Sequence, residues 1–395
     1  MAFDRACLRD ADVDGRTVLV RADLNVPLEA GQVGDDTRIR AALPTIRDLV
    51  SRNARVVLCS HLGRPGGIPA REFSLGPVAD RLSELLGTEV ELAPEVVGDR
   101  ARAMAAGLAP GEVLLLENTR FEPGETDNDP ELARELAAVA DLFVNDAFGT
   151  AHRAHASNAG VAALLPAYAG MLLEREVSNL SAVADDPDRP LVVVLGGAKV
   201  SDKIGVIDRF LELADQILIG GAMCFPFYRA RGIATGDSLV EEDGITLAAG
   251  ALEKAEGSGC ELCLPVDLSL GREFDPATDR RDLDGVEVPD GWMGLDIGPR
   301  SATGYAGRIA AAGTVLWNGP MGAFELDQFD SGTRTVAEAV AGAAGFTVVG
   351  GGDSVAALAK FGLTDRVDWV STGGGASLEL LEGRPLPGVE ALKAA

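Results

Sequence analysis

The sequence PLVVVLGGAKVSDKIG, residues 190–205, runs from an apolar segment through a glycine turn into a predicted helix. Its first half is β-branched and apolar at successive positions, which is typical of a strand covered on both faces of a parallel sheet. The glycine turn is expected to open a helix that carries Lys199 and Lys203. These lysines are four residues apart, a spacing that places both on one helical face.

The same order of strand, turn and helix recurs along the chain. Strands are predicted within residues 17–25, 55–63, 112–120, 141–149, 190–199, 216–222, 260–267, 314–320 and 346–354. Helices are predicted at 75–86, 130–140, 201–213, 300–312 and 333–342, with another beginning at Arg38. Strands that alternate with helices indicate an α/β fold with parallel sheets. Ligands of such folds bind beyond the carboxyl ends of the strands.

A segment near the middle of the chain, residues 171–184, differs from its surroundings. Apolar residues are spaced 4, 3 and 4 apart along it, and DDPDRP (185–190) ends the pattern. A chain of 395 residues is long enough for two domains. We therefore expect a hinge helix between an N-terminal domain, residues 1–170, and a second domain, residues 185–371. An ordinary crossover helix inside one large sheet is the alternative.

Composition limits the class of protein. With 47% hydrophobic and 24% charged residues, the chain can bury a core and is not disordered. A net charge of −26 disfavours binding to nucleic acid or to an anionic membrane surface. The surface, poor in lysine and rich in acid, resembles that of proteins from salt-loving organisms. No signal peptide or membrane span is evident, so we expect a cytoplasmic protein, and we expect a monomer.

The N-terminal half holds a cluster of basic residues. All three histidines (His61, His152 and His155) precede residue 156, and arginines lie near the predicted strand ends at Arg21, Arg64, Arg120 and Arg153. Arginine grips phosphate or carboxylate with a planar fork, so the cluster predicts a site for a small, multiply charged anion. For any one arginine, a surface salt bridge is the alternative. The histidines lack partners at the spacing of a zinc site.

The C-terminal half holds three glycine-rich turns before predicted helices, at 196–205, 348–360 and 371–381. Free amides at helix starts bind phosphate, and the carboxylate of Asp353 is suited to Mg²⁺. Asn318 and Glu325 are candidate partners for ribose hydroxyls. The turns match neither the Walker P-loop nor the dinucleotide-binding pattern. Taken singly, each turn could be only a tight connection, but together they indicate a nucleotide site.

An anion site and a nucleotide site together predict phosphoryl transfer, which needs positioning, Mg²⁺ and positive charge around the moving group. The glycine-rich half contains no histidine. This favours a carboxylate acceptor, because a carboxylate is already ionised at pH 7 and needs no general base. Closure of the domains about the 171–184 helix would keep water from the transferring group.

Nearly the whole chain resembles the phosphoglycerate kinase family. The motifs that carry the resemblance are RADLNVP (21–27), DTRIRAALPTI (36–46), SHLGRP (60–65), LLENTRF (115–121), VNDAFGTAHRAHAS (144–157), LGGAKVSDKI (195–204), GWMGLDIGP (291–299), WNGPMGAFE (317–325), GGGDS (350–354) and STGGGASLELLEG (371–383). The resemblance implies two Rossmann-like, three-layer parallel-sheet domains. It also implies that residues 372–395 return to the N-terminal domain.

The implied reaction is reversible: 1,3-bisphosphoglycerate and ADP give 3-phosphoglycerate and ATP, with Mg²⁺, by in-line transfer. The implied phosphoglycerate site comprises Asp23, Asn25, Arg38, His61, Arg64, Arg120 and Arg153. The implied nucleotide site comprises Gly197, Ala198, Lys199, Lys203, Gly221, Leu295, Asn318, Glu325, Gly352, Asp353 and Ser354, with Asp353 also holding the metal. Arg38 and Lys199 would flank the transferring phosphoryl group, assisted by the amides of Gly373, Gly374 and Gly375.

Two positions depart from the family pattern. Ala222 stands where a third glycine is common, and Pro226 stands where threonine is common. Both departures bear on the shape of the adenine pocket. A nucleotide-binding regulatory protein on the same scaffold, without turnover, is the alternative function. Such a protein would be expected to have lost Arg38 or Lys199, and both residues are intact.

Overall fold

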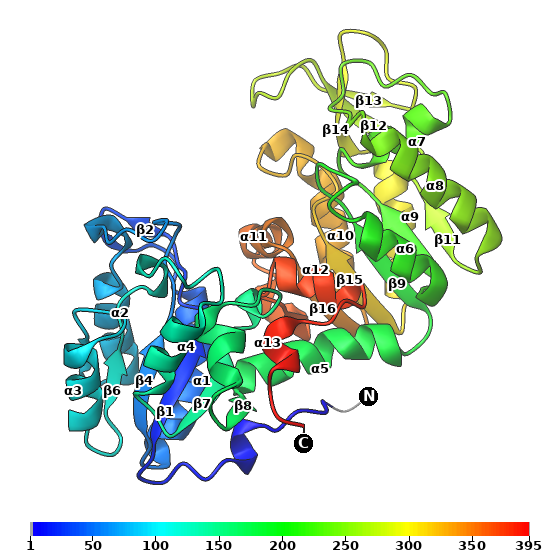
Figure 1. Ribbon diagram of the computed structural model, residues 1–395. Helices are drawn as coiled ribbons and strands as arrows, with labels where there is room; N and C mark the ends of the chain where they lie inside the picture. Colours follow the sequence, from blue (N-terminus) through cyan, green and yellow to red (C-terminus); the bar gives the residue numbers. More distant parts are fainter. Residues whose placement is uncertain (1–2, 395) are drawn as a thin grey trace. The chain divides into compact units, whose positions relative to one another are not determined.

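The computed structural model describes residues 3–394, which form two compact units (Figure 1). The first unit contains residues 3–178 and 384–394, and the second contains Asn179–Gly383. The division lies inside helix α5 (Met171–Asp185), so this helix links the units. Each unit is built around its own six-stranded parallel sheet. This confirms the predicted α/β class with two parallel-sheet domains.

The first unit has strand order β5-β6-β4-β1-β7-β8. Its strands are β1 (Thr17–Ala22), β2 (Leu28–Glu29), β3 (Gln32–Val33), β4 (Arg55–Cys59), β5 (Val90–Leu92), β6 (Val113–Leu115), β7 (Leu142–Asp146) and β8 (Ala167–Ala169), of which β2 and β3 form a separate hairpin. Its helices are α1 (Thr37–Ser51), α2 (Gly76–Leu86), α3 (Asp99–Gly107), α4 (Pro130–Ala137) and α13 (Pro387–Glu390), with short turns η1 (Leu8–Asp10), η2 (Arg71–Phe73), η3 (Thr119–Phe121), η4 (Phe148–Thr150) and η5 (Ala156–Gly160).

The sheet of the first unit is covered on both faces. On one face, Val18 and Val56 join residues of α1 and α2 in a single apolar cluster. The alternate residues Leu19 and Val57 point to the opposite face and are also fully buried. Burial of successive strand residues explains why these strands are apolar throughout, and it gives the unit three layers.

The second unit repeats this plan with strand order β11-β10-β9-β15-β16-β17. Its strands are β9 (Leu191–Leu195), β10 (Gln216–Ile219), β11 (Glu261–Cys263), β12 (Leu268–Gly271), β13 (Arg281–Leu283), β14 (Met293–Ile297), β15 (Thr314–Asn318), β16 (Phe346–Gly350) and β17 (Trp369–Val370). Its helices are α6 (Ile204–Leu213), α7 (Cys224–Ala230), α8 (Gly244–Gly257), α9 (Pro299–Ala310), α10 (Ser331–Gly342), α11 (Gly352–Phe361) and α12 (Gly375–Leu381), with η6 (Asp327–Phe329) and η7 (Thr364–Arg366). Strands β12, β13 and β14 form a small antiparallel sheet that the sequence did not predict.

The end of the chain returns to the first unit. Gly388 donates its amide hydrogen to the carbonyl of Ala151 (2.8 Å) and accepts from the side chain of Asn145 (3.0 Å). Ala394 forms an antiparallel bridge with Arg5. Of the segment expected to return, residues 372–383 belong to the second unit, where α12 packs on α6, and residues from 384 onward belong to the first.

The expected helix over Lys199 and Lys203 is wrong in its starting point. Helix α6 begins at Ile204, so both lysines lie in the preceding turn and do not share a helical face. The turn is held by side-chain contacts that compete with helix formation. Ser201 donates from its amide to Glu241 (3.0 Å), and Val200 is fully buried. Such side-chain to backbone bonds favour turns over helix.

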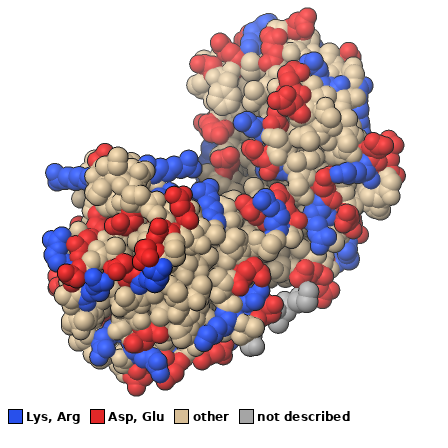
Figure 2. Space-filling model, viewed as in Figure 1, with Lys and Arg blue, Asp and Glu red and all other residues tan. Residues whose placement is uncertain are grey.

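The surface carries charges of both signs, with acidic side chains spread over the visible face (Figure 2). Among residues 3–394 there is no helix that is both long and apolar enough to cross a membrane.

Candidate active site

The basic cavity lies at the carboxyl ends of the first unit's strands. Its volume is about 420 Å³, and three of the predicted arginines line it. They are Arg64, Arg120 and Arg153. Arg120 is held in place because its guanidinium donates to the carbonyl of Gly63 (2.6 Å). Partial burial, together with the charges of Arg21 and Arg153, lowers the pKa of Arg120. Unlike surface ion pairs, these arginines converge on one cavity, as the sequence predicted.

Asp23, Asn25 and Arg38 form a second group at the end of β1 and the start of α1. Arg38 donates to the carbonyl of Asn25 (3.0 Å) and lies 3.4 Å from a carboxylate oxygen of Asp23. The side chain of Asn25 accepts the amide hydrogen of Gly63 (2.9 Å) and thereby ties β1 to the loop after β4. Arg38 remains partly exposed, so its guanidinium can still reach a ligand.

His61 is buried at the end of β4, next to the guanidinium of Arg21. Burial lowers the pKa of His61 well below its ordinary value, and the neighbouring arginines lower it further. His61 is therefore neutral at physiological pH. Glu125, a carboxylate that the sequence analysis did not single out, is also buried and lies 3.8 Å from Nδ1 of His155.

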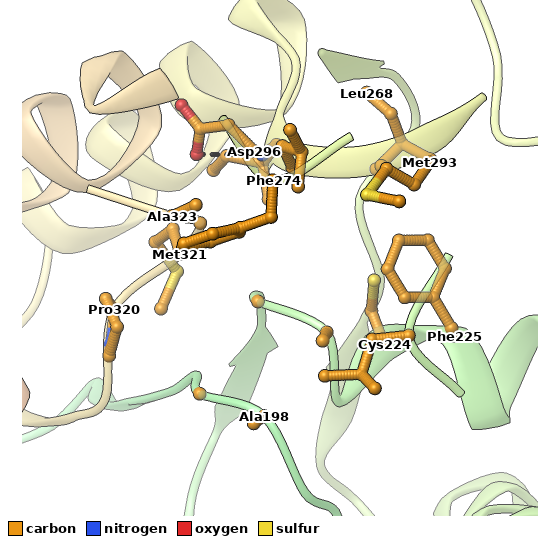
Figure 3. Close-up of a pocket in the computed structure, with 18 of the residues that line it drawn as sticks. Ala198, Cys224, Phe225, Leu268, Phe274, Met293, Asp296, Pro320, Met321 and Ala323 are labelled. Atoms are coloured by element: carbon orange, nitrogen blue, oxygen red, sulfur yellow. Dashed lines mark hydrogen bonds between the residues drawn. The ribbon is translucent and has the colours of Figure 1, made fainter. Parts of the chain in front are cut away.

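The glycine-rich cavity lies at the carboxyl ends of the second unit's strands and has a volume of about 480 Å³ (Figure 3). Six predicted nucleotide residues line it: Gly197, Ala198, Gly221, Leu295, Glu325 and Asp353. The apolar part of the wall was missed. Phe225 and Met293 lie on one side of this cavity, with Cys224 beside them (Figure 3). Phe274 and Leu239 also line it although both are largely exposed, and such exposed apolar side chains are typical of a binding surface.

The two glycines at the floor of this cavity are required by backbone packing. Gly221 has φ +66°, and a Cβ at this position would lie 2.6 Å from the amide nitrogen and the carbonyl oxygen of Gly197. Gly197 itself has φ +106°. Residues with a side chain are disfavoured at both positions, so the two turns can approach each other closely. Ala222, one of the departures from the family pattern, is tolerated on the cavity wall, and Pro226 lies inside the short helix α7.

Lys199 and Lys203 have different environments. The side chain of Lys203 is buried, and its ammonium group donates to the carbonyls of Gly196 (2.5 Å) and Asn318 (2.7 Å). Burial lowers the pKa of Lys203 to about 8. Lys203 thus joins the turn after β9 to the turn after β15, while Lys199 is exposed. The lysine available to a phosphate is therefore Lys199.

Asp353 and Ser354 lie in the first turn of α11, directly after the glycine turn that follows β16. The buried hydroxyl of Ser354 accepts the amide hydrogen of Gly319 (2.5 Å), which ties this helix to the neighbouring turn. Asp353 is exposed at the edge of the cavity. Asn318 is buried, and Gly352 is exposed in the first turn of the helix.

The third glycine turn contains Gly373, Gly374 and Gly375 and leads into α12. Gly374 has φ +54° and precedes the helix. The hydroxyls of Ser371 and Ser377 hydrogen-bond across the turn (2.7 Å) and stabilise it. The turn therefore presents backbone amides at a helix start, a geometry suited to a developing negative charge.

Comparison with known proteins shows the family of the chain. The sequence model for phosphoglycerate kinase matches residues 8–384. The chain belongs to the phosphoglycerate kinase family. It is 52% identical to phosphoglycerate kinase from Thermosipho africanus, over 99% of this chain and 98% of the relative. It is also 52% identical to the cytosolic phosphoglycerate kinase 3 of Arabidopsis thaliana, over 98% of this chain and 97% of the relative.

Solved structures of phosphoglycerate kinase agree with the fold. The structure from Coxiella burnetii superposes with a TM-score of 0.90 at 42% identity, covering 98% of both chains. The structure from Pyrococcus horikoshii superposes with a TM-score of 0.84 at 34% identity, also covering 98% of both. The chain is accordingly a kinase, a phosphotransferase with a carboxyl group as acceptor.

Proposed function

We propose that this phosphotransferase moves a phosphoryl group reversibly between 1,3-bisphosphoglycerate and ADP, giving 3-phosphoglycerate and ATP, and that it requires Mg²⁺. The observation that carries the proposal is the division of the chemistry between two cavities. Three arginines converge in the first unit, and glycine turns with an apolar wall form the cavity of the second. A small multiply charged anion fits the former, and a nucleotide fits the latter.

The phosphoglycerate is assigned to the basic cavity. Arg64, Arg120 and Arg153 would bind its phosphate, since guanidinium groups match phosphate oxygens in pairs. Asp23 and Asn25 lie beside Arg38, where they would bind the hydroxyl and carboxylate end of the substrate. His61, which is neutral, would add a hydrogen bond.

The nucleotide is assigned to the glycine-rich cavity. Phe225, Met293 and Leu295 would contact the base, and Glu325 the ribose. Asp353 fits a magnesium ion, because Mg²⁺ in nucleotide sites is commonly held by one or two carboxylates while phosphates and water complete its shell. When bound, the ion would neutralise charge on the nucleotide phosphates.

The chain's own groups would then act on the transferring phosphoryl group. Arg38 and Lys199 would balance its charge, and the amides of Gly373, Gly374 and Gly375 would donate to its oxygens. The carboxylate acceptor needs no general base. Arg38 and Lys199 belong to different units, so we further propose that the units close about α5 when both substrates are bound. Closure would exclude water and prevent wasteful hydrolysis.

We also propose that the protein works as a cytoplasmic monomer on small molecules and that its acidic surface suits it to high salt. With Lys+Arg 35 against Asp+Glu 61, surface charges repel one another and salt would screen them.

The test is ADP formation from Mg-ATP in molar KCl, with and without 3-phosphoglycerate. We expect ADP only when the acid is present. Glycerate, which lacks the phosphate, serves as the matched control and should support little turnover. ADP formation without the acid would make the chain an ATPase. No ADP in either case would favour the regulatory nucleotide-binding protein and contradict the proposal.

A further inference from the structure

A buried carboxylate, Glu125, lies between η3 and α4 and takes no direct part in the proposed function. It accepts hydrogen bonds from the amide (3.0 Å) and the hydroxyl (2.6 Å) of Ser157. The hydroxyl of Thr119 donates to the same carboxylate (3.2 Å). A buried charge is costly unless it is paired and hydrogen-bonded, and these three hydrogen bonds stabilise the carboxylate in its buried position.

The hydrogen bonds continue from Ser157 to Arg21. The single hydrogen of the Ser157 hydroxyl goes to Glu125, so its oxygen is free to accept from Nε of Arg21 (2.8 Å). Arg21 is itself buried, and its Nη1 donates to the carbonyl of Ala22 (2.5 Å). Two of the guanidinium's nitrogens are thus held, which orients the third, Nη2, toward His61.

The contact between Arg21 and His61 determines which ring nitrogen of His61 carries the hydrogen. Nη2 of Arg21 lies 3.1 Å from Nδ1 of His61. A guanidinium has only donors and stays protonated, so Nδ1 must accept and cannot carry a hydrogen. The hydrogen of the neutral ring is then on Nε2.

The groups around His61 also oppose its protonation. Arg21 on β1, Arg120 on η3 and Arg38 on α1 all bring positive charge toward the ring. His155, from the loop before η5, is the fourth titratable neighbour and is itself buried. The carboxylate of Glu125 lies 3.8 Å from Nδ1 of His155. The ring of His61 is therefore kept from becoming a cation.

We infer that Glu125, Ser157 and Arg21 form a positioning relay that holds His61 in its neutral form with the hydrogen on Nε2. His61 then offers the anionic substrate a hydrogen bond and no charge. Glu125 fixes the hydroxyl of Ser157, and Ser157 in turn fixes the guanidinium of Arg21. The inference deepens the proposed function, because it rests on phosphoglycerate binding in the basic cavity.

Nitrogen NMR of the protein labelled with ¹⁵N-histidine tests the relay without any substrate. The chain has three histidines, and His61→Gln identifies the signals of His61. We expect one neutral form, protonated on Nε2, from about pH 6 to pH 8, although an unperturbed imidazole titrates in that range. Ser157→Ala should release Arg21 and give a mixture with the Nδ1-protonated form. A wild-type ring protonated on Nδ1, or an unchanged tautomer in both Ser157→Ala and Glu125→Gln, would overturn the relay.

Kinetics provide the second readout. We expect Ser157→Ala to raise KM for 3-phosphoglycerate about tenfold, because a misoriented donor loses one hydrogen bond to a charged ligand, while kcat changes little. His61→Gln, a neutral side chain with its own donor, should bind better than His61→Ala. Equal losses in these two variants would contradict the uncharged role of His61.

Glu117→Gln is the matched control. Glu117 is also a buried glutamate of the first unit, but it accepts from the amides of Leu75 (2.8 Å) and Asn118 (3.3 Å). This variant should leave the tautomer of His61 and KM unchanged. If wild-type protein shows no turnover with 3-phosphoglycerate, the proposed function fails while the NMR result still decides the relay.

Discussion

For single residues, burial gives different roles to side chains that look equivalent in the sequence. Lys199 and Lys203 belong to one motif, yet the ammonium of Lys203 is bound to the carbonyls of Gly196 and Asn318. Lys199 is exposed beside the same glycine turn. Lys199 is therefore available to contact a ligand, and Lys203 maintains the shape of the two turns.

Lys199→Ala is expected to lower kcat by more than a hundredfold, because the loss of a cation at the transferring group costs about 3 kcal/mol or more. Steady-state kinetics with Mg-ATP and 3-phosphoglycerate would measure it. Lys254→Ala removes an exposed lysine of α8, which pairs with Asp208, and should have little effect. An unchanged kcat in the Lys199 variant would remove this residue from its assigned role.

Arg153→Ala is expected to raise KM for 3-phosphoglycerate about tenfold to a hundredfold, since a hydrogen bond between charged groups is lost. Affinity for the nucleotide should stay the same, because Arg153 lines the cavity of the first unit. Arg134→Ala, which removes an arginine paired with Glu131 on α4, is the matched control. A defect in KM for ATP instead would contradict the assignment of ligands to units.

At the scale of elements, the linking helix α5 begins on a buried acid. Asp146, at the end of β7, accepts the amide hydrogens of Leu172 (2.8 Å) and Leu173 (3.3 Å). These are first-turn amides, which have no partner within the helix. Burial raises the pKa of Asp146 to about 7. Asp296 likewise accepts the amide hydrogen of Gly332 (2.7 Å) in the first turn of α10. Burial also raises the pKa of Asp296 to about 7.

The raised pKa of Asp146 predicts a pH dependence of stability. Between its unfolded value near 4 and about pH 7, the folded protein binds the proton more tightly than the unfolded chain. This contribution to stability is complete below about pH 4 and is lost as pH rises through 7. Asp146→Asn, which keeps an acceptor without the charge, should make the free energy of unfolding less dependent on pH over this range. Urea titrations at several pH values would measure it, and an identical pH dependence would show that Asp146 does not titrate as described.

At the scale of the whole molecule, two units carry one proposed ligand site each. Helix α5 belongs to both units, and residues from 384 onward bring the chain back to the first. With one proposed site on each unit, each ligand would bind to its own unit before the reaction begins. This arrangement also explains why phosphoryl transfer would require both ligands together.

Small-angle X-ray scattering is expected to show a smaller radius of gyration only when Mg-ATP and 3-phosphoglycerate are both present, because closure needs contacts from both ligands. Each ligand alone should leave most molecules open. Scattering that stays unchanged with both ligands, under conditions where turnover is measured, would count against closure about α5.

The sequence was sufficient for the fold class and for several of the residues that line the two cavities. Apolar strands such as β9 and β16, followed by glycine turns, can be covered only by helices on both faces, and their polar residues must gather at the carboxyl ends. These are local patterns, so they predicted both the parallel sheets and the clustering of Arg64, Arg120 and Arg153.

Other features depend on packing between residues far apart in the sequence, so local patterns could not predict them. The small sheet of β12, β13 and β14 pairs short strands with weak periodicity, and the start of α6 depends on a contact with Glu241, forty residues away. The apolar wall with Phe225 and Phe274, and the buried chain from Glu125 to His61, join residues far apart in sequence. Burial and hydrogen-bond partners arise only when the chain folds, so tertiary structure alone distinguishes Lys203 from Lys199 and gives Glu125 its place.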